Sequence, residues 1–271
     1  MTLGRVEIKL LGQTRIGAQN QIINPPAPKV RQVLALLALR AGDVVGSDGI
    51  IMELWGEEPP RTAITTTQTY IYQLRRLIGD LTKTKPSKRV LATHHPGYVL
   101  RVDRTNVDAY RFHRLIEQAR GLADDHPARS AEVAREALSL VDDEPLSDIT
   151  PGVVLQPYVT QLREEVLDAI QLRIALDMRL GRHHRVVGEL QALTGRYPLR
   201  EWFHYQLMSA LHRCGRRGEA LHAYRNLERT LRVELGIDPS AQLVRLHRRI
   251  LAGEPTTSAA GSDEFTIMLG A

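Results

Sequence analysis

The stretch RTAITTTQTYIYQLRRLIG, residues 61–79, has the hydrophobic period of a helix with two unlike faces. At about 100° per residue, one face is apolar and is predicted to contact a core: Ile64, Ile71, Leu74 and Ile78. The opposite face and its flank are polar: Thr62, Thr65, Thr69, Tyr72, Gln73, Arg75 and Arg76. No carboxylate lies between Arg61 and Gly79. Such a face suits base edges and phosphates, although an ordinary amphipathic helix with a solvated outer face has the same pattern.

Length and composition indicate a soluble globular protein with room for two domains in 271 residues. The sequence has no run of eighteen apolar residues and no basic-then-apolar amino-terminal leader. Its one cysteine, Cys214, excludes a disulfide framework within one chain and fits a reducing compartment. We therefore expect a cytoplasmic protein that does not bind membranes.

The positive charge is concentrated in the amino-terminal part of the chain. Residues 1–104 contain 15 Lys and Arg against 8 Asp and Glu, whereas residues 105–271 contain 21 against 23. A basic excess of this kind predicts a polyanionic partner. A membrane surface could attract the same charge, but no segment combines a basic face with bulky membrane-inserting aromatics. The charge distribution therefore favours nucleic acid.

The segments before residue 61 predict a small antiparallel sheet and two helices. Alternating apolar residues at 6–10, 14–16 and 21–23 predict three short strands, with a turn at 17–20. A first helix is expected over 29–41, where Val33, Leu34, Leu36 and Leu37 face inward. A second is expected over 48–55, with Ser47 as its N-cap and Gly56 after its end. With the 61–79 helix this is a helix-turn-helix order.

A basic loop and a predicted hairpin follow the third helix. Lysines and arginine in the loop would lie close to phosphates: Lys83, Lys85, Lys88 and Arg89. Residues 90–93 and 98–102 read as two strands joined by His94-His95-Pro96-Gly97. Proline followed by glycine predicts a type II turn. A hairpin directly after a candidate DNA-recognition helix is typical of the wing of a winged-helix domain.

From residue 105 onward the pattern is helical almost throughout. Helices are expected over 107–121, 128–141, 158–180, 183–196, 199–214, 218–235 and 241–251, with an acidic link over 142–157. Asp238 is a candidate N-cap and Pro239 a first-turn proline for the last helix. One unit resembles a degenerate tetratricopeptide repeat: Leu207, Leu211, Gly215, Ala220, Tyr224 and Leu227. The alternative is a helical bundle that serves only dimerisation or stability.

Other conspicuous residues favour packing over chemistry. At helical spacing, Trp202, Tyr205 and Tyr224 are expected in the core of the repeat. The histidines, His183 and His184 among them, have no carboxylate or cysteine partner at metal-ligand spacing. The Gly-, Ser- and Thr-rich residues 254–271 predict a disordered tail.

Taken together, these segments resemble the Streptomyces antibiotic regulatory protein (SARP) family of transcription activators from about residue 6 to 253. The motifs that carry the resemblance are LLG at 10–12, LWG-x-x-PP at 54–60, TYIYQLRRLIG at 69–79, PGYVL at 96–100 and VDAYRF at 107–112. The resemblance implies a mainly α fold with a small β part. That fold would have an N-terminal winged helix-turn-helix of the response-regulator output type, over residues 1–104. A C-terminal all-α, tetratricopeptide-like bacterial transcriptional activation domain would cover residues 105–253.

The resemblance also implies partners and a DNA-contacting set of residues. The partners are double-stranded promoter DNA with tandem direct repeats, a second copy side by side on the DNA, and RNA polymerase holoenzyme through its σ and α subunits. The residues expected to face bases are Thr65, Thr69, Tyr72 and Arg76. Those expected to meet phosphates or backbone are Thr62, Thr66, Gln73, Arg75, Lys83, Lys85, Lys88, Arg89, His94 and His95.

The sequence gives little support to an enzyme. It contains no G-x-x-x-x-G-K-[ST], no H-E-x-x-H and no G-x-S-x-G, so no catalytic residue, metal or cofactor is expected. The main prediction is a sequence-specific activator of a secondary-metabolite gene cluster. The rival is a protein-interaction scaffold that uses the repeat groove, with the winged helix as a dimerisation module.

Overall fold

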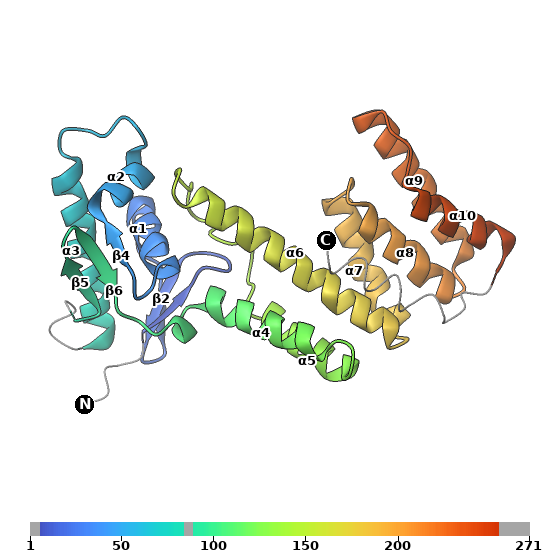
Figure 1. Ribbon diagram of the computed structural model, residues 1–271, viewed down its shortest axis with the longest axis horizontal. Coiled ribbons are helices and arrows are strands. Elements are labelled where there is room, and N and C mark those ends of the chain that lie inside the picture. The colour runs from blue at the N-terminus through green and yellow to red at the C-terminus, as the bar shows by residue number, and fades with distance from the viewer. Residues whose placement is uncertain (1–5, 84–88, 255–271) are drawn as a thin grey trace. The chain divides into compact units, whose positions relative to one another are not determined.

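The structure is a computed structural model that describes residues 6–83 and 89–254 (Figure 1). The chain forms two compact units, which are described one at a time. The first unit comprises Met1–Gly121 and Glu132–Ile170, and the second comprises Leu122–Ala131 and Gln171–Ala271. The expected tail at 254–271 lies outside the described residues, apart from Glu254.

The first unit begins with the predicted antiparallel sheet. Its strands are β1 (Glu7–Lys9), β2 (Arg15–Ala18) and β3 (Gln21–Ile23), paired in the order β1-β2-β3. The turn between β2 and β3 is tighter than predicted, because Gly17 and Ala18 are still paired in the ladder. Gln19 and Asn20 form the turn and have positive φ angles of 50° and 65°. These angles are typical of the two-residue hairpin turn.

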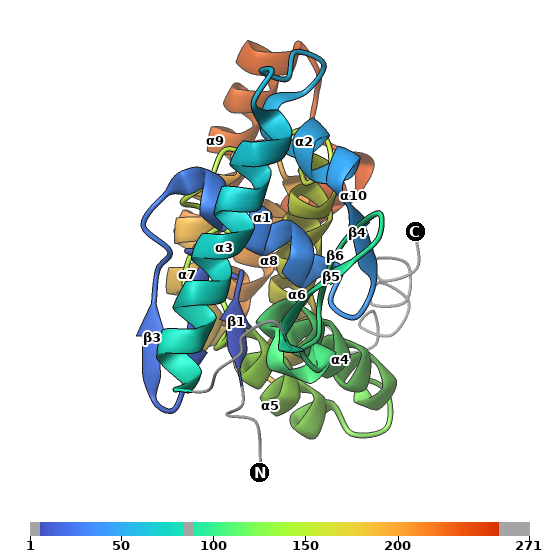
Figure 2. The ribbon, with the colours of Figure 1, turned by 90° about the vertical axis from the view of Figure 1, so that its left-hand side faces the viewer.

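Three helices follow, as predicted: α1 (Pro28–Leu39), α2 (Ser47–Trp55) and α3 (Ala63–Thr82). The four residues predicted to point inward from α1 are all buried. Helix α3 packs against both α1 and α2, and Figure 2 shows it crossing in front of α1. Ile71, Leu74 and Ile78 of α3 are buried, as the pattern predicted.

Helix α3 does not stop at Gly79 as predicted. It continues to Thr82, and Lys83 ends it in the left-handed conformation, with φ at 51°. Leu81 and Thr82 are both buried, and the Thr82 hydroxyl donates a hydrogen bond to the Ile78 carbonyl at 2.7 Å. Burial of this last turn therefore outweighs the helix-ending tendency of a glycine.

The wing is a three-stranded sheet and not the predicted hairpin alone. Strands β5 (Leu91–His94) and β6 (Gly97–Leu100) pair as expected, and β6 also pairs with β4 (Val44–Gly46). The sequence analysis did not predict β4, whose pairing partner β6 lies far along the chain. A Cβ on Gly97 would collide with the Val45 carbonyl oxygen, so this glycine permits the close approach of β4.

Two local predictions around the wing are wrong. The hairpin turn is not type II: His94 pairs with Gly97, and the His95–Pro96 peptide bond is cis, which is the type VI arrangement. Ser47 is not an N-cap, since Gly46 occupies that position. The Ser47 hydroxyl donates to the Pro96 carbonyl at 3.0 Å, and so connects α2 to the hairpin turn.

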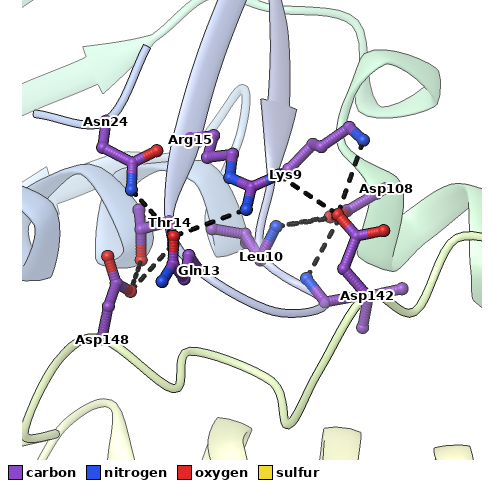
Figure 3. A network of polar contacts seen from close by, with 10 residues as sticks. Lys9, Leu10, Gln13, Thr14, Arg15, Asn24, Asp108, Asp142 and Asp148 are labelled. Carbon is purple, nitrogen blue, oxygen red and sulfur yellow. Dashed lines mark hydrogen bonds and ion pairs between the residues drawn. The ribbon is translucent and has the colours of Figure 1, made fainter. Parts of the chain in front are cut away.

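A short 3-10 helix η2 (Arg104–Asn106), α4 (Asp108–Leu122) and α5 (Pro127–Leu138) come next. The segment that follows, residues 139–155, contains most of the acidic link predicted over 142–157 and is hydrogen-bonded to the loop between β1 and β2 (Figure 3). Backbone N–H groups of Asp142 and Leu146 donate to the carbonyls of Leu11 and Leu10, each at 2.9 Å. Asp148 accepts from both the N–H and the hydroxyl of Thr14, at 2.8 and 3.0 Å. The link is therefore part of the first unit's structure.

Two buried or half-buried carboxylates make further connections within this unit. Asp108 accepts hydrogen bonds from the N–H groups of Leu10 and Leu11, at 2.8 and 3.1 Å (Figure 3). Glu53 of α2 is only 2% exposed. It accepts hydrogen bonds from three backbone N–H groups just before α6, those of Gly152, Val154 and Leu155, at 2.7 to 3.0 Å.

Asp108 makes the stability of the first unit depend on pH. Burial raises the pKa of its carboxyl to about 6, although the N–H groups of Leu11, Leu10 and Ala109 and the charge of Lys9 lower it. Between pH 4 and 6 the folded chain therefore holds a proton that the unfolded chain has released. The free energy of unfolding falls as the pH rises through this window, by up to about 3 kcal/mol from this one carboxyl.

Urea unfolding of the parent and of Asp108→Asn at pH 4 and pH 7 checks this prediction. The variant has no carboxyl at this position to titrate, so its free energy of unfolding should decrease less between the two pH values. Equal decreases in parent and variant would contradict it.

The second unit contains the C-terminal part of α6 (Gln156–Arg179) and four further helices. These are α7 (His183–Arg196), α8 (Glu201–Arg213), α9 (Arg217–Leu235) and α10 (Ala241–Ala252). Consecutive helices from α7 to α10 pack on one another, and α10 also packs on α8. The five side chains of the predicted repeat core are buried, and Gly215 makes the turn between α8 and α9 with φ at 75°.

Of the three aromatic residues expected in the core of the repeat only Tyr224 is buried, and one helix start also differs from its prediction. Tyr224 is buried and its ring stacks on His247 at 3.9 Å, while Trp202 and Tyr205 are half-buried. Asp238 does not cap α10, because Ser240 holds the N-cap position. Its carboxylate instead accepts a hydrogen bond from the Arg232 guanidinium at 3.0 Å.

Candidate nucleic-acid interface

The four residues predicted to face bases share one exposed side of α3. Thr65, Thr69, Tyr72 and Arg76 are all exposed, and the Tyr72 ring is 66% exposed. Their spacing of four, three and four residues places them along about 16 Å of one helical face. An α-helix is about 10–12 Å across with its side chains, and it fits the B-DNA major groove, which is about 12 Å wide. The structure therefore brings these four predicted residues together.

The hydrogen-bonding capacity of this face differs from residue to residue. The Thr69 hydroxyl donates to the Thr65 carbonyl at 3.0 Å, which leaves its oxygen free to accept a hydrogen bond from a base amino group. Arg76 lies 3.9 Å from Asp80, one turn further along, and both side chains are about three-quarters exposed. A surface pair of this kind contributes little, so the Arg76 guanidinium can leave Asp80 for a base edge.

The predicted phosphate contacts surround this face, with two of them outside the described residues. Lys85 and Lys88 are those two. Exposed side chains are Thr62, Gln73, Lys83, Arg89, His94 and His95, and Thr66 is half-buried. Thr62 is the N-cap residue of α3, and His94 and His95 lie at the hairpin turn. The exposed members therefore lie at the start of α3 (Thr62), in its middle (Gln73), after its end (Lys83 and Arg89) and on the wing (His94 and His95).

Arg75, for which a phosphate contact was predicted, makes hydrogen bonds within the protein. Its Nε donates to the Leu91 carbonyl at 2.9 Å and its Nη2 donates to the Thr93 hydroxyl at 2.8 Å. The guanidinium also lies 5.8 Å from the centre of the Tyr98 ring. Burial lowers its pKa, and the neighbouring Tyr98 opposes that shift. Arg75 thus connects α3 to the wing, and its contact with phosphate stays a prediction.

Two exposed residues of this surface were missed by the sequence analysis. Ile64 was predicted to face the core, and this is wrong, since its side chain is 64% exposed. At the start of α3 the buried positions are Ala63 and Thr67, so Ile64 lies beside the buried stripe. Gln68, one turn after Ile64, is also exposed. The i, i+4 spacing of Ala63, Thr67 and Ile71 was the signal available for this assignment.

The described part of the chain has neither a membrane-spanning helix nor a cluster of metal ligands. None of the helices within residues 6–83 and 89–254 is long and apolar enough to span a membrane. In that same part of the chain, no three His, Cys, Asp or Glu side chains are placed to share a metal ion.

Comparison with known proteins gives the family. Residues 25–100 match the family model described as transcriptional regulatory protein, C terminal, and residues 107–251 match the bacterial transcriptional activator domain. Regulatory protein DnrI of Streptomyces peucetius is 41% identical, with 95% of this chain and 96% of that protein covered. Transcriptional regulator RedD of Streptomyces coelicolor is 33% identical, with 93% and 72% covered.

A solved structure shows the same architecture over almost the whole chain. Mycobacterium tuberculosis EmbR, in complex with a low affinity phosphopeptide, superposes with a TM-score of 0.84 at 30% identity. The match covers 98% of this chain and 71% of that one. It confirms the predicted fold class, a winged helix-turn-helix followed by a helical activator domain. The chain belongs to the Streptomyces antibiotic regulatory protein family of DNA-binding transcriptional activators, which are not enzymes.

Proposed function

We propose that this protein activates a secondary-metabolite gene cluster by reading promoter DNA with α3. The observation that carries the proposal is the exposed face of that helix, where Thr65, Thr69, Tyr72 and Arg76 lie in line. Guanidinium pairs with guanine O6 and N7, and hydroxyls pair with several base edges. With α3 in the major groove, these side chains would face base edges.

The groups around α3 would hold the helix in register. Lys83 and Arg89 lie on either side of the loop after α3, and His94 and His95 are at the turn of the wing. Contacts from these side chains to phosphate oxygens fix position and orientation but carry no sequence information. The predicted contacts of Lys85 and Lys88 in the same loop belong to this set.

The assembly on the promoter is also a proposal. We assign residues 1–104 to DNA binding and residues 105–253 to activation, close to the ranges that the two family models match. Two copies would bind side by side on tandem direct repeats. The helical part would then contact RNA polymerase through its σ and α subunits. These points, and the kind of gene cluster controlled, rest on the family resemblance.

Replacing Arg76 with alanine should lower affinity for the cognate site by about 5- to 150-fold, equivalent to about 1–3 kcal/mol. The variant should also discriminate less at one base pair, because a bidentate contact to guanine has been removed. Footprinting on promoters next to the protein's own gene would locate the site. Fluorescence anisotropy with each single-base variant of that site then gives the affinities.

Two matched variants control for the loss of charge. Arg114 is an exposed arginine of α4, and Arg114→Ala should bind as the parent does. Arg89→Ala should weaken binding to every duplex about equally and reduce the salt slope by about one. If Arg76→Ala behaves like Arg114→Ala, the assignment of Arg76 is wrong. If the parent itself prefers no sequence, the scaffold alternative replaces the proposal.

A further inference from the structure

An aliphatic side chain lies exposed at the start of the helix that reads DNA. Ile64 is the second residue of α3, and its side chain is 64% exposed. Single exposed aliphatic residues are common on proteins, so the exposure alone carries no argument. What distinguishes Ile64 is its position on α3 and the side chains beside it.

Ile64 begins a row of exposed residues that runs along α3. Residues four apart are neighbours on a helix, and this row winds round α3 by about 40° at each step, from beside the buried stripe to the base-facing side: Ile64, Gln68, Tyr72 and Arg76. Two members of the row are among the side chains already assigned to base edges. The N-terminal residues of a recognition helix are the ones that approach base edges most closely. Ile64 therefore lies at the N-terminal end of this row, at the edge of the surface that would enter the groove.

The wing covers the same side of α3 further along, but not at Ile64. Arg75 lies three turns after Ile64 on nearly the same side, at about 100° per residue. Its guanidinium is bonded to Leu91 and Thr93 of strand β5. No such cover reaches the first turn, as the exposure of Ile64 shows. This side of the helix is thus closed by protein at one end and open at the other.

The chemistry of an isoleucine side chain restricts what it can recognise. It has no hydrogen-bond donor or acceptor, and the apolar group at the edge of the major groove is the 5-methyl group of thymine. A β-branched side chain in a helix is held mostly in one rotamer, so little freedom is lost on contact. We propose that Ile64 is a specificity-determining residue that recognises the 5-methyl group of a thymine in the operator.

The inference rests on the proposed function, and it makes the reading of the operator more specific. Gln68 follows Ile64 in the row, and a glutamine amide pairs with N6 and N7 of adenine. The proposal therefore expects A·T pairs under the first turns of α3. Contacts further along the helix, from Tyr72 and Arg76, fall on the neighbouring pairs.

Replacing single thymines of the operator with deoxyuridine tests the inference, because uracil pairs as thymine does but lacks the methyl group. After the operator has been located by footprinting, each thymine is replaced in turn, and affinities are measured for the parent, Ile64→Ala and Ile64→Val. Val233→Ala is the matched control, since Val233 is a β-branched residue that is 75% exposed on α9. Circular dichroism melting checks that each variant folds like the parent.

At one or two thymines, loss of the methyl group should weaken the parent about fourfold. Ile64→Ala should bind the thymine and deoxyuridine duplexes equally there. Ile64→Val should retain most of the discrimination, and Val233→Ala all of it.

Two results would overturn the inference. In the first, the parent binds its operator specifically, but each deoxyuridine weakens the parent and Ile64→Ala by the same factor. The proposed function would then stand without this contact. The other is an Ile64→Ala variant that weakens all duplexes alike and changes the dependence on protein concentration, which would place Ile64 at a protein contact. A parent without sequence preference would instead defeat the proposed function itself.

Discussion

Glu53→Ala is expected to lower the free energy of unfolding by about 3 kcal/mol, although Glu53 is not among the predicted DNA contacts. The Glu53 carboxylate is 2% exposed and accepts from the N–H groups of Gly152, Val154 and Leu155. The Gln32 amide also donates to it at 2.6 Å. Alanine would leave the three backbone N–H groups without this acceptor, whereas the Gln32 amide would still donate to the backbone carbonyl of residue 53 at 3.1 Å. Each unsatisfied donor has a desolvation cost.

The arrangement is that of a carboxylate at a helix N-terminus, supplied from another helix. The three N–H groups lie just before α6, where a helix leaves its first donors without internal partners. The positive end of the α6 dipole adds to the attraction for the negative charge. Glu53→Gln should therefore lose less stability than Glu53→Ala, because the amide oxygen can still accept a hydrogen bond. It should remain less stable than the parent, because the amide NH2 would face other N–H donors.

Urea unfolding measures both effects, and the tryptophans can report on the two units separately. Trp55 lies two residues after Glu53 in the first unit, and Trp202 lies in the second. Trp55 fluorescence should change at lower urea in both Glu53 variants. Glu58 is an exposed acid nearby, and Glu58→Ala should unfold within about 0.5 kcal/mol of the parent. Glu53→Ala and Glu58→Ala with equal midpoints would contradict the role given to Glu53.

Features set by local periodicity could be predicted from the sequence, and those set by distant contacts could not. The buried stripe of α3 at Ile71, Leu74 and Ile78 followed from the helical period. Glu53 gave no comparable signal, because in sequence it is an acid on a short helix. Its partners lie about one hundred residues later, and only the folded chain brings them together.

The candidate site shows the same division. The exposure of Thr65, Thr69, Tyr72 and Arg76 agreed with the pattern, because the opposite face of α3 has a core to meet. Ile64 was misassigned because residue type suggested a core where Ala63 and Thr67 are the buried residues. The two hydrogen bonds from Arg75 to β5 depend on how the wing folds back on α3, and residue spacing does not reveal that arrangement.

A fragment that ends at residue 104 is expected to be largely unfolded at 25 °C, whereas a fragment of residues 1–170 should fold. The shorter fragment retains the predicted DNA-binding domain but loses partners of the N-terminal sheet. Asp108 would no longer accept from Leu10 and Leu11, and Asp148 would no longer accept from Thr14. Glu53 would lose all three of its backbone donors.

The apolar losses add to the polar ones. Val107 and Phe112 are fully buried, and Val107 is bridged to Ile8 of β1. Removal of a buried aromatic side chain alone costs about 3–5 kcal/mol. The sum is comparable with the whole free energy of unfolding of a small domain, about 5–15 kcal/mol.

Circular dichroism and urea unfolding of the two fragments decide the matter. The 1–170 fragment should show a cooperative transition, and it should bind operator DNA because it contains the complete wing and α3. If the 1–104 fragment folds as stably and binds as tightly, the contacts from α4 and the acidic link are dispensable for the winged helix. The predicted domain boundary at residue 104 would then also be a folding boundary. If only the longer fragment folds, α3 is held in its DNA-reading position by residues that belong, in sequence, to the activator domain.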